Sequence, residues 1–264
     1  MANRDNDRDV FGIRQLPQPF RHVDDAIAAA PVRVDPWEHI VAERVFAPDV
    51  YASIEEKFPR GAMYQRHPKV DETQFFGADH LRLEALLPRD AELLGAEQRA
   101  LWVPIAEHLR SADFISGLIA RFRPRLVARF GADLDAPDFV ERRLDAKFMF
   151  VLHEPGYSLG VHTDMPWKVL TAVFYVPERG DTNALGTALY VPRDPGFACN
   201  GSRHYDPAGF QHVATVPYRP NTAFIFARGD RTFHGVEPCT AEALGGSFRP
   251  GFHLNVNERP PAGP

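Results

Sequence analysis

The chain has 264 residues, 44% of them hydrophobic and 25% charged, with a net charge of −5. This length can bury a sizeable core, and the composition excludes the basic surface typical of nucleic-acid-binding domains. The apolar runs are too short to cross a bilayer, and residues 1–9 are polar, unlike a signal peptide. The two cysteines form no disulfide framework. We therefore expect a cytoplasmic globular protein that binds neither membranes nor nucleic acids.

The first half of the chain is predicted to be mainly helical. Residues 1–20 are expected to form a flexible N-terminal arm, and residues 21–140 a mainly helical support region. A short pair of strands is expected around residues 40–46. This region would buttress the part of the chain that follows.

Three helices are expected within the support region. Apolar residues recur at helical spacing in residues 47–58 and again in residues 96–109. Ser111 can cap a third helix that runs through Phe122, and Pro124 is expected to break it.

The second half of the chain consists of short β-rich runs separated by Gly, Pro, Asn and Asp. Eight such runs with turn residues between them predict a β-sandwich or a jelly-roll barrel. We expect the core to span residues 141–258 and a Pro/Gly-rich tail, residues 259–264, to be disordered. The runs cover residues 147–153, 157–162, 169–176, 187–191, 211–216, 223–227, 232–236 and 252–256.

A candidate metal site begins at His162-Thr163-Asp164, at the end of a predicted strand. Side chains two residues apart on a strand point to the same face, so His162 and Asp164 can reach one ion. The third ligand must come from another strand, and His234 lies in a β-rich run directly after a turn. Two neutral imidazoles and one carboxylate suit ferrous iron and leave one face of the ion open for a co-substrate and dioxygen.

A lone His-x-Asp pair in a chain with 11 histidines is more often structural than metal-binding. The order of the surrounding motifs is what supports a metal site here. From about residue 147 to 257 the chain resembles the 2-oxoglutarate/Fe(II)-dependent dioxygenase superfamily, and within it the prolyl-4-hydroxylase-like branch. The matching motifs are the first metal motif at 156–164, the next core strand at 168–176, Gly-Thr-Ala-Leu at 186–189 in place of the usual Gly-Gly-x-Leu, and residues 221–226 leading into His234-Gly235-Val236.

The resemblance implies a double-stranded β-helix, a cupin-like jelly roll, that uses Fe(II), 2-oxoglutarate as co-substrate and O2. It implies that Tyr175 hydrogen-bonds the far carboxylate of 2-oxoglutarate. Thr171 lies on the same strand face and could line that pocket. Lys168 is either a second anchor for the co-substrate or a charge at the rim, and we favour the rim.

Arg249 is the candidate partner of the far carboxylate, because a planar guanidinium can donate two parallel hydrogen bonds to it. The basic residue of this branch usually follows the distal His by roughly ten residues, and Arg249 lies further on. The Gly-containing stretch 241–246 is interpreted as a lengthened loop that accounts for the difference. Arg228 and Arg231 are competing candidates, but both precede His234.

Four residues are candidates for the substrate pocket, each with a structural alternative. Trp167 follows the metal motif and is either a pocket wall or a packed rim aromatic. Phe76 could belong to a lid, or to core or interface packing. Arg231 could bind an anionic group or be solvated, and His153 could face the cavity or be structural. The polar loop 193–205 is placed to cover the site.

The function expected from these features is hydroxylation of an unactivated C–H bond of a small molecule in bacterial specialised metabolism, with release of succinate and CO2. A carboxylate at Asp164 favours hydroxylation over halogenation, because halogenating relatives have a small residue there. Two alternatives stay open: a prolyl-type hydroxylase of a protein or peptide, and a non-catalytic cupin-type protein that binds a metal or a small molecule. A zinc hydrolase is a weaker third. The protein is expected to be a monomer or a homodimer.

Overall fold

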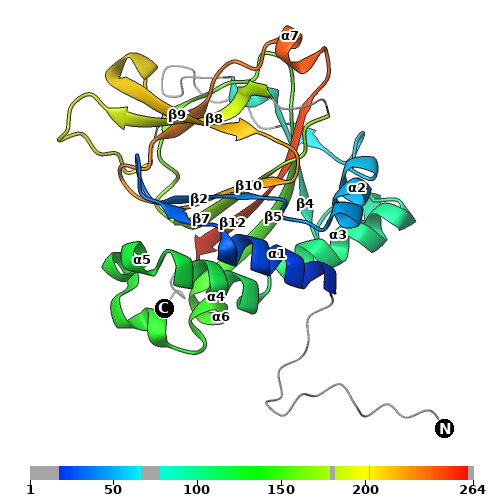
Figure 1. Cartoon of the computed structure of the whole chain (residues 1–264), viewed down its shortest axis with the longest axis horizontal. Helices are drawn as coiled ribbons and strands as arrows, with labels where there is room; N and C mark the ends of the chain where they lie inside the picture. The colour runs from blue at the N-terminus through cyan, green and yellow to red at the C-terminus, as the bar shows by residue number, and fades with distance from the viewer. Residues whose placement is uncertain (1–17, 67–77, 179–181, 202, 261–264) are drawn as a thin grey trace.

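Twelve strands form two antiparallel sheets in the computed structural model, which describes residues 18–66, 78–178, 182–201 and 203–260 (Figure 1). The strands are β1 (Val32–Arg33), β2 (His39–Glu43), β3 (Gln65–Arg66), β4 (Arg82–Leu87), β5 (Leu144–His153), β6 (Leu159–His162), β7 (Lys168–Tyr175), β8 (Thr182–Pro192), β9 (Phe210–Tyr218), β10 (Thr222–Ala227), β11 (His234–Val236) and β12 (Arg249–Glu258). The larger sheet has the order β1-β2-β10-β7-β12-β5-β4-β3, and the smaller sheet has the order β6-β11-β8-β9. Two facing antiparallel sheets are the jelly-roll architecture predicted for the core, so this prediction is confirmed.

Helices cover the outer face of the larger sheet, as Figure 1 shows for α1, α3, α4, α5 and α6. The helices of the described residues are α1 (Gln18–Ala29), α2 (Pro48–Glu56), α3 (Ala96–Leu109), α4 (Ala112–Arg121), α5 (Arg123–Phe130), α6 (Phe139–Arg143) and α7 (Ala241–Leu244). Four short 3-10 segments complete them: η1 (Asp79–Leu81), η2 (Ala91–Leu93), η3 (Gly131–Asp135) and η4 (Pro207–Gly209).

Strand alternation in the larger sheet separates two of the hydrophobic cores. On β7, Leu170, Ala172 and Phe174 pack into the core beneath the helices. Tyr175 points the other way and packs with Leu189 of the smaller sheet. Successive side chains of a strand point to opposite faces, so the same strand serves the helical layer and the space between the sheets. The functional side chains lie in that space.

Trp102 of α3 anchors the helical layer to the larger sheet. Its side chain is fully buried, and its indole N–H donates to the carbonyl of Lys57 at 2.9 Å. Its ring contacts those of Phe150 on β5 and Phe252 on β12, with centroids 4.8 and 5.2 Å apart. Buried aromatic residues each remove a large apolar area from water, so this contact stabilises the strand pair that carries part of the site.

The predicted elements of the second half agree with the structure: each of the eight β-rich runs overlaps one of the strands β5–β12. In the first half, α2 and α3 lie where helices were predicted, and the Ser111 hydroxyl accepts from the N–H of Phe114 at 3.2 Å as the N-cap of α4. The interruption at Pro124 lasts one residue, because α5 begins directly with this proline in its first turn, where no N–H is needed.

The structure differs from the sequence-based expectations at the two ends of the chain and in the predicted helical region. Residues 18–20, assigned to the N-terminal arm, form the first turn of α1. Arg259, assigned to the disordered tail, donates from its main-chain N–H to Arg143 and from Nε to the carbonyl of Leu144 at 2.7 and 2.6 Å. The first half also contributes strands at both edges of the larger sheet. The rest of the predicted arm and tail lies outside the described residues.

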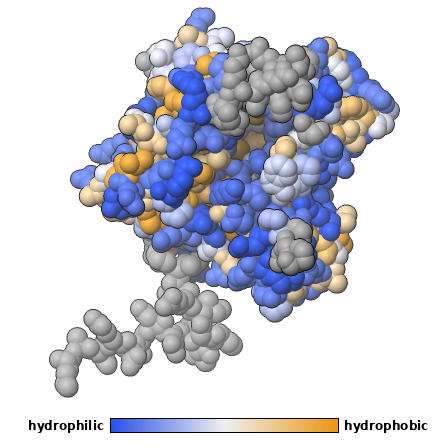
Figure 2. All heavy atoms as spheres, turned by 180° about the vertical axis from the view of Figure 1, so that it is seen from behind, coloured by the Kyte–Doolittle hydropathy of each residue, from blue (hydrophilic) through white to orange (hydrophobic). Residues whose placement is uncertain are grey.

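On the face seen in Figure 2, hydrophobic residues occur in small separate groups among hydrophilic ones. The large hydrophobic side chains that are exposed in the described part of the chain are far apart in sequence, as with Val34, Trp167 and Val213. None of the described helices is long and apolar enough to cross a membrane.

Candidate metal centre and its cavity

The predicted metal ligands converge at one end of the smaller sheet. His162 ends β6 and His234 begins β11, and the two residues are direct partners in the strand pairing, with ring centroids 4.3 Å apart. Asp164 follows His162 by two residues. One ligand atom from each of the three residues lies within 4.8 Å of the other two. Two imidazoles and one carboxylate grouped in this way fit an Fe(II) ion bound on one face.

Both histidines are held in a ligating orientation by the main chain two residues earlier. Nδ1 of His162 lies 3.0 Å from the carbonyl of Gly160, and Nδ1 of His234 lies 3.0 Å from the carbonyl of Thr232. A carbonyl only accepts, so the proton is assigned to Nδ1, and Nε2 keeps its lone pair for a metal. Burial lowers the pKa of both rings, and the other ring's charge lowers that of His162 further. Both imidazoles are therefore neutral at pH 7.

The carboxylate of Asp164 is fixed by two donors from β7. Lys168 Nζ donates to Oδ1 at 2.8 Å, and Thr171 Oγ1 donates to Oδ2 at 2.5 Å. Burial alone would raise the pKa of Asp164, but the Lys168 ammonium and the two histidines hold it below its usual range. Asp164 is thus ionised and oriented, as a metal ligand must be. Lys168 contacts a predicted metal ligand and also lines the cavity.

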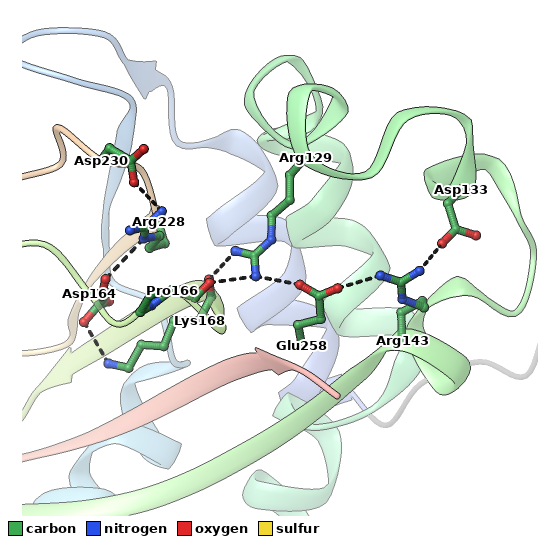
Figure 3. A network of polar contacts seen from close by, with 9 residues as sticks. All are labelled: Arg129, Asp133, Arg143, Asp164, Pro166, Lys168, Arg228, Asp230 and Glu258. Carbon is green, nitrogen blue, oxygen red and sulfur yellow. Dashed lines mark hydrogen bonds and ion pairs between the residues drawn. The ribbon is translucent and has the colours of Figure 1, made fainter. Parts of the chain in front are cut away.

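The loop that carries Asp164 is fixed to α5 and β12 by Arg129 (Figure 3). Its guanidinium donates to the carbonyls of Lys168 and Pro166 at 2.7 and 2.8 Å, and to the carboxylate of Glu258 at 2.7 Å. Glu258 in turn accepts from Arg143 at 2.5 Å. This network links the metal loop to the helical layer through charge-assisted hydrogen bonds, which are stronger than neutral ones.

The loop 193–205 packs directly on the main chain of Asp164. Gly201 has φ +83°, and a Cβ there would lie 2.1 Å from the Asp164 carbonyl oxygen, so only glycine fits. Arg228 Nε donates to the same carbonyl at 3.2 Å (Figure 3). The sequence placed this loop over the site, and the structure shows His204 of the loop with its ring centroid 4.5 Å from that of His162.

The three ligands open onto a cavity of about 390 Å³ between the sheets. Arg249 also lines the cavity; it is 3% exposed. Its Nε donates to the carbonyl of Leu185 at 2.6 Å, and its guanidinium lies over the rings of Tyr218 and Tyr175 at 4.7 and 5.5 Å. Its Nη2 has no hydrogen-bond partner among the described residues. A buried guanidinium with an unused donor in a shared cavity fits the far carboxylate of a dicarboxylate that also reaches the metal.

The remaining predicted residues divide into those inside and those outside this cavity. Thr171 and His153 line it. Tyr175 lies beside Arg249, and its hydroxyl lies 2.6 Å from that of Thr187, which lines the cavity. Phe76 falls outside the described residues.

Two candidates for the substrate pocket lie outside this cavity. Trp167 is 53% exposed and lines a separate surface hollow, because it lies in the turn past Asp164 and its carbonyl accepts from the N–H of Glu258 at 2.7 Å. Arg231 is exposed and donates to the carbonyls of Pro195 and Phe197, so it supports the loop 193–205 from outside the cavity.

Sequence reasoning missed two basic residues that line the cavity, Arg82 and His253. His253 follows Arg249 by four residues on β12, so strand alternation alone places it on the same face. Arg82 lies on β4, a strand of the first half that the sequence did not predict. No signal in the sequence connects it with the metal motif.

Comparison with known proteins supports the fold. No family model and no curated protein matches the chain. Among solved structures, a prolyl hydroxylase from Trichoplax adhaerens in complex with a hypoxia inducible factor peptide fragment is 12% identical, with a TM-score of 0.53 over 90% of each chain. A prolyl-4-hydroxylase from Pseudomonas putida is 16% identical, with a TM-score of 0.48 over 91% of this chain and 99% of the other.

A third similar structure is HygX from Streptomyces hygroscopicus with nickel and 2-oxoglutarate bound, which is 12% identical, with a TM-score of 0.44 over 92% of this chain and 87% of the other. At such identities the likeness shows the fold alone. The chain has the double-stranded β-helix fold of the 2-oxoglutarate/Fe(II)-dependent oxygenases, and within it the triad His162, Asp164 and His234.

Proposed function

We propose that this protein is a 2-oxoglutarate-dependent non-haem iron oxygenase that hydroxylates an unactivated C–H bond of a small molecule. The overall reaction converts 2-oxoglutarate, O2 and the substrate C–H into succinate, CO2 and C–OH. One observation carries the proposal: the triad of His162, Asp164 and His234 and the unused donor of Arg249 share one cavity.

The residues of the cavity have separate tasks in this proposal. Fe(II), when bound, supplies the redox chemistry that couples decarboxylation of the co-substrate to oxidation of the substrate. Arg249 binds the far carboxylate of 2-oxoglutarate, with Tyr175 beside it. Thr171 and Lys168 keep the Asp164 carboxylate oriented.

Apolar side chains of β10 keep water away from the ligands. Phe226 lies edge-on to His234 with ring centroids 4.8 Å apart, and Phe224 lines the same cavity. Exclusion of water strengthens the electrostatic interactions within the site and limits side reactions.

A prolyl-type hydroxylase of a peptide is the second candidate function. The likeness to the peptide-bound prolyl hydroxylase of Trichoplax adhaerens favours it. We rank it second, because the cavity of about 390 Å³ is of the size that small-molecule sites usually have.

The test is formation of succinate from 2-oxoglutarate in aerobic solution with Fe(II) and ascorbate. We expect turnover in the wild type, none in Asp164→Ala, and stimulation by small molecules more than by proline-containing peptides. Stimulation by peptides alone would make the second candidate the better one. If the protein binds iron but consumes no 2-oxoglutarate, with or without added compounds, the oxygenase proposal is contradicted and a cupin-type binding protein is favoured.

A further inference from the structure

The cavity carries more positive charge than the proposed metal and co-substrate sites use. Among the described residues, three cations line it, Arg82, Lys168 and Arg249, against the single carboxylate of Asp164. Lys168 and Asp164 form an ion pair at 2.8 Å and so offset each other. Arg249 is assigned to the far carboxylate of 2-oxoglutarate. Arg82 is therefore the cation that neither site uses.

Arg82 belongs to a row of basic residues that crosses three strands. Arg82 on β4 is the direct partner of His153 on β5, which is the direct partner of Arg249 on β12. Neighbouring strands lie about 4.8 Å apart, so the two arginines start from positions about 10 Å apart. In the strand order His153 lies between the two arginines, and all three residues line the cavity.

The guanidinium of Arg82 forms an ion pair through Nε, and its terminal nitrogens can donate to a ligand. Its Nε forms an ion pair with Glu84 at 2.7 Å, and its side chain is 20% exposed. Its hydrogen bond within the described part of the chain runs from Nη2 to the thioether of Met149 at 3.6 Å, and a thioether is a weak acceptor. The end of the guanidinium thus lacks, among the residues that the structure describes, a strong acceptor such as a carboxylate or phosphate would provide.

His153 adds a second unused donor. Its Nδ1 lies 3.0 Å from Nη1 of Arg249, and since a guanidinium can only donate, Nδ1 accepts. A neutral ring then carries its proton on Nε2, which is buried and has no partner among the described residues. Burial, together with the charges of Arg249 and Arg82, keeps the pKa of His153 well below its usual value. The ring therefore stays a neutral donor at pH 7.

We propose that Arg82 and His153 form a second anion site, which binds an anionic oxygen group of the primary substrate, a carboxylate or a phosphate. This inference rests on the proposed function, because it names the substrate class of the same cavity: small organic acids. Arg82 supplies the charge and a fork of donors suited to two oxygens, and His153 supplies a buried N–H. A cationic substrate finds no free carboxylate among the described lining residues.

The experiment compares acids with neutral compounds of the same skeleton. Benzoate and benzamide, hexanoate and hexanamide, and glycerol 3-phosphate and glycerol are titrated by calorimetry into the full-length protein, both metal-free and loaded anaerobically with Fe(II) and 2-oxoglutarate. We expect at least one acid to bind the wild type about tenfold or more tighter than its neutral counterpart, as a charge-assisted hydrogen bond predicts. Preference for the carboxylates or for the phosphate identifies which anion the site takes.

Variants then assign the effect to Arg82. Arg82→Gln should remove the preference for the acid and leave the affinity for 2-oxoglutarate unchanged, whereas Arg82→Lys should keep part of the preference. Glu84→Gln should strengthen acid binding, because it frees Arg82 from its ion pair. Arg21→Gln, at an exposed position of α1, is the matched control.

Equal response to acids and neutral compounds in the wild type, including no response to either, would overturn the inference. So would an Arg82→Gln variant that folds normally but binds 2-oxoglutarate more weakly, because Arg82 would then belong to the co-substrate site. Failure of the oxygenase proposal is distinguishable, because acid binding to the metal-free protein does not require iron chemistry.

Discussion

His162 and His234 each bond the main-chain carbonyl two residues earlier in the chain, which leaves Nε2 of both rings for a metal. This orientation is a local property of the chain at each histidine, so the metal site could be inferred from the spacing of three residues. The hydrogen bonds of Arg249 run to Leu185 on β8 and His153 on β5, and no sequence pattern revealed them.

Replacement of Arg249 tests the co-substrate site. Arg249→Gln should weaken 2-oxoglutarate binding at least about tenfold, because it removes a charge-assisted hydrogen bond. Metal affinity should stay unchanged, since Arg249 contacts no predicted metal ligand. Calorimetric titration of 2-oxoglutarate into Mn(II)-loaded protein measures this. Arg249→Lys, which keeps the charge without the planar fork, should be intermediate. Equal affinity in wild type and Arg249→Gln would contradict the assignment.

Replacement of Thr171 separates two roles for that residue. The sequence placed Thr171 in the co-substrate pocket, but its hydroxyl donates to Asp164 at 2.5 Å. Thr171→Val keeps the shape and removes the donor, so it should weaken metal binding by about 10–100-fold, the usual loss for a supporting partner. Titration with Fe(II) or Co(II) under anaerobic conditions measures the change. If Thr171→Val binds metal normally but binds 2-oxoglutarate weakly, Thr171 belongs to the co-substrate pocket, as the sequence predicted.

At the scale of elements, close packing of a loop on a strand end decides where Asp164 lies. Gly201 leaves no room for a Cβ beside the Asp164 carbonyl, and its φ of +83° already favours glycine. Gly201→Ala should therefore displace the metal loop and weaken metal binding at least about tenfold, the usual effect of disturbing the support of a metal ligand.

Gly246→Ala is the matched control for this prediction. Gly246 has φ +78° as well, but a Cβ there meets nothing within 4 Å. The two variants share the backbone strain and differ in the steric clash, so metal titration should distinguish them. If both lose metal affinity equally, backbone strain and not the contact with Asp164 is responsible.

Helices and strands could be predicted where a local sequence pattern marks them, and not where they depend on pairing with a strand distant in the sequence. The eight runs of the second half are rich in β-forming residues and separated by Gly, Pro, Asn and Asp, and these turn residues made strands β5–β12 predictable. Strand β4 pairs with β3 on one side and, on the other, with β5 from the second half of the chain, and the sequence analysis did not predict it. The two roles considered for Trp167 could not be separated from the sequence, because the direction of a turn depends on its contacts with β12.

At the scale of the whole molecule, buried histidines make stability depend on pH. Burial is the largest cause that lowers the pKa of five of them. The unfolded chain therefore binds more protons than the folded chain below the usual histidine pKa of about 6.5, so stability is lost as pH falls through that value. These residues are His39, His153, His162, His234 and His253.

Urea unfolding of the metal-free protein between pH 7.5 and 5.5 measures this dependence. The free energy of unfolding should decrease as the pH is lowered, by up to about 1.4 kcal/mol per pH unit for each histidine that stays neutral in the folded state. His253→Gln should make the slope shallower, whatever its effect on stability at pH 7.5. A free energy that is constant over this range would contradict the burial of neutral histidines.

The most direct test of the central claim is an anaerobic titration of the metal-free protein with Fe(II) and 2-oxoglutarate, followed by visible absorption. If His162, Asp164 and His234 hold the iron and Arg249 the co-substrate, a metal-to-ligand charge-transfer band should appear only when both are added. It should be lost in Asp164→Ala and need higher 2-oxoglutarate in Arg249→Ala. Bound iron without this band in the wild type would contradict the account.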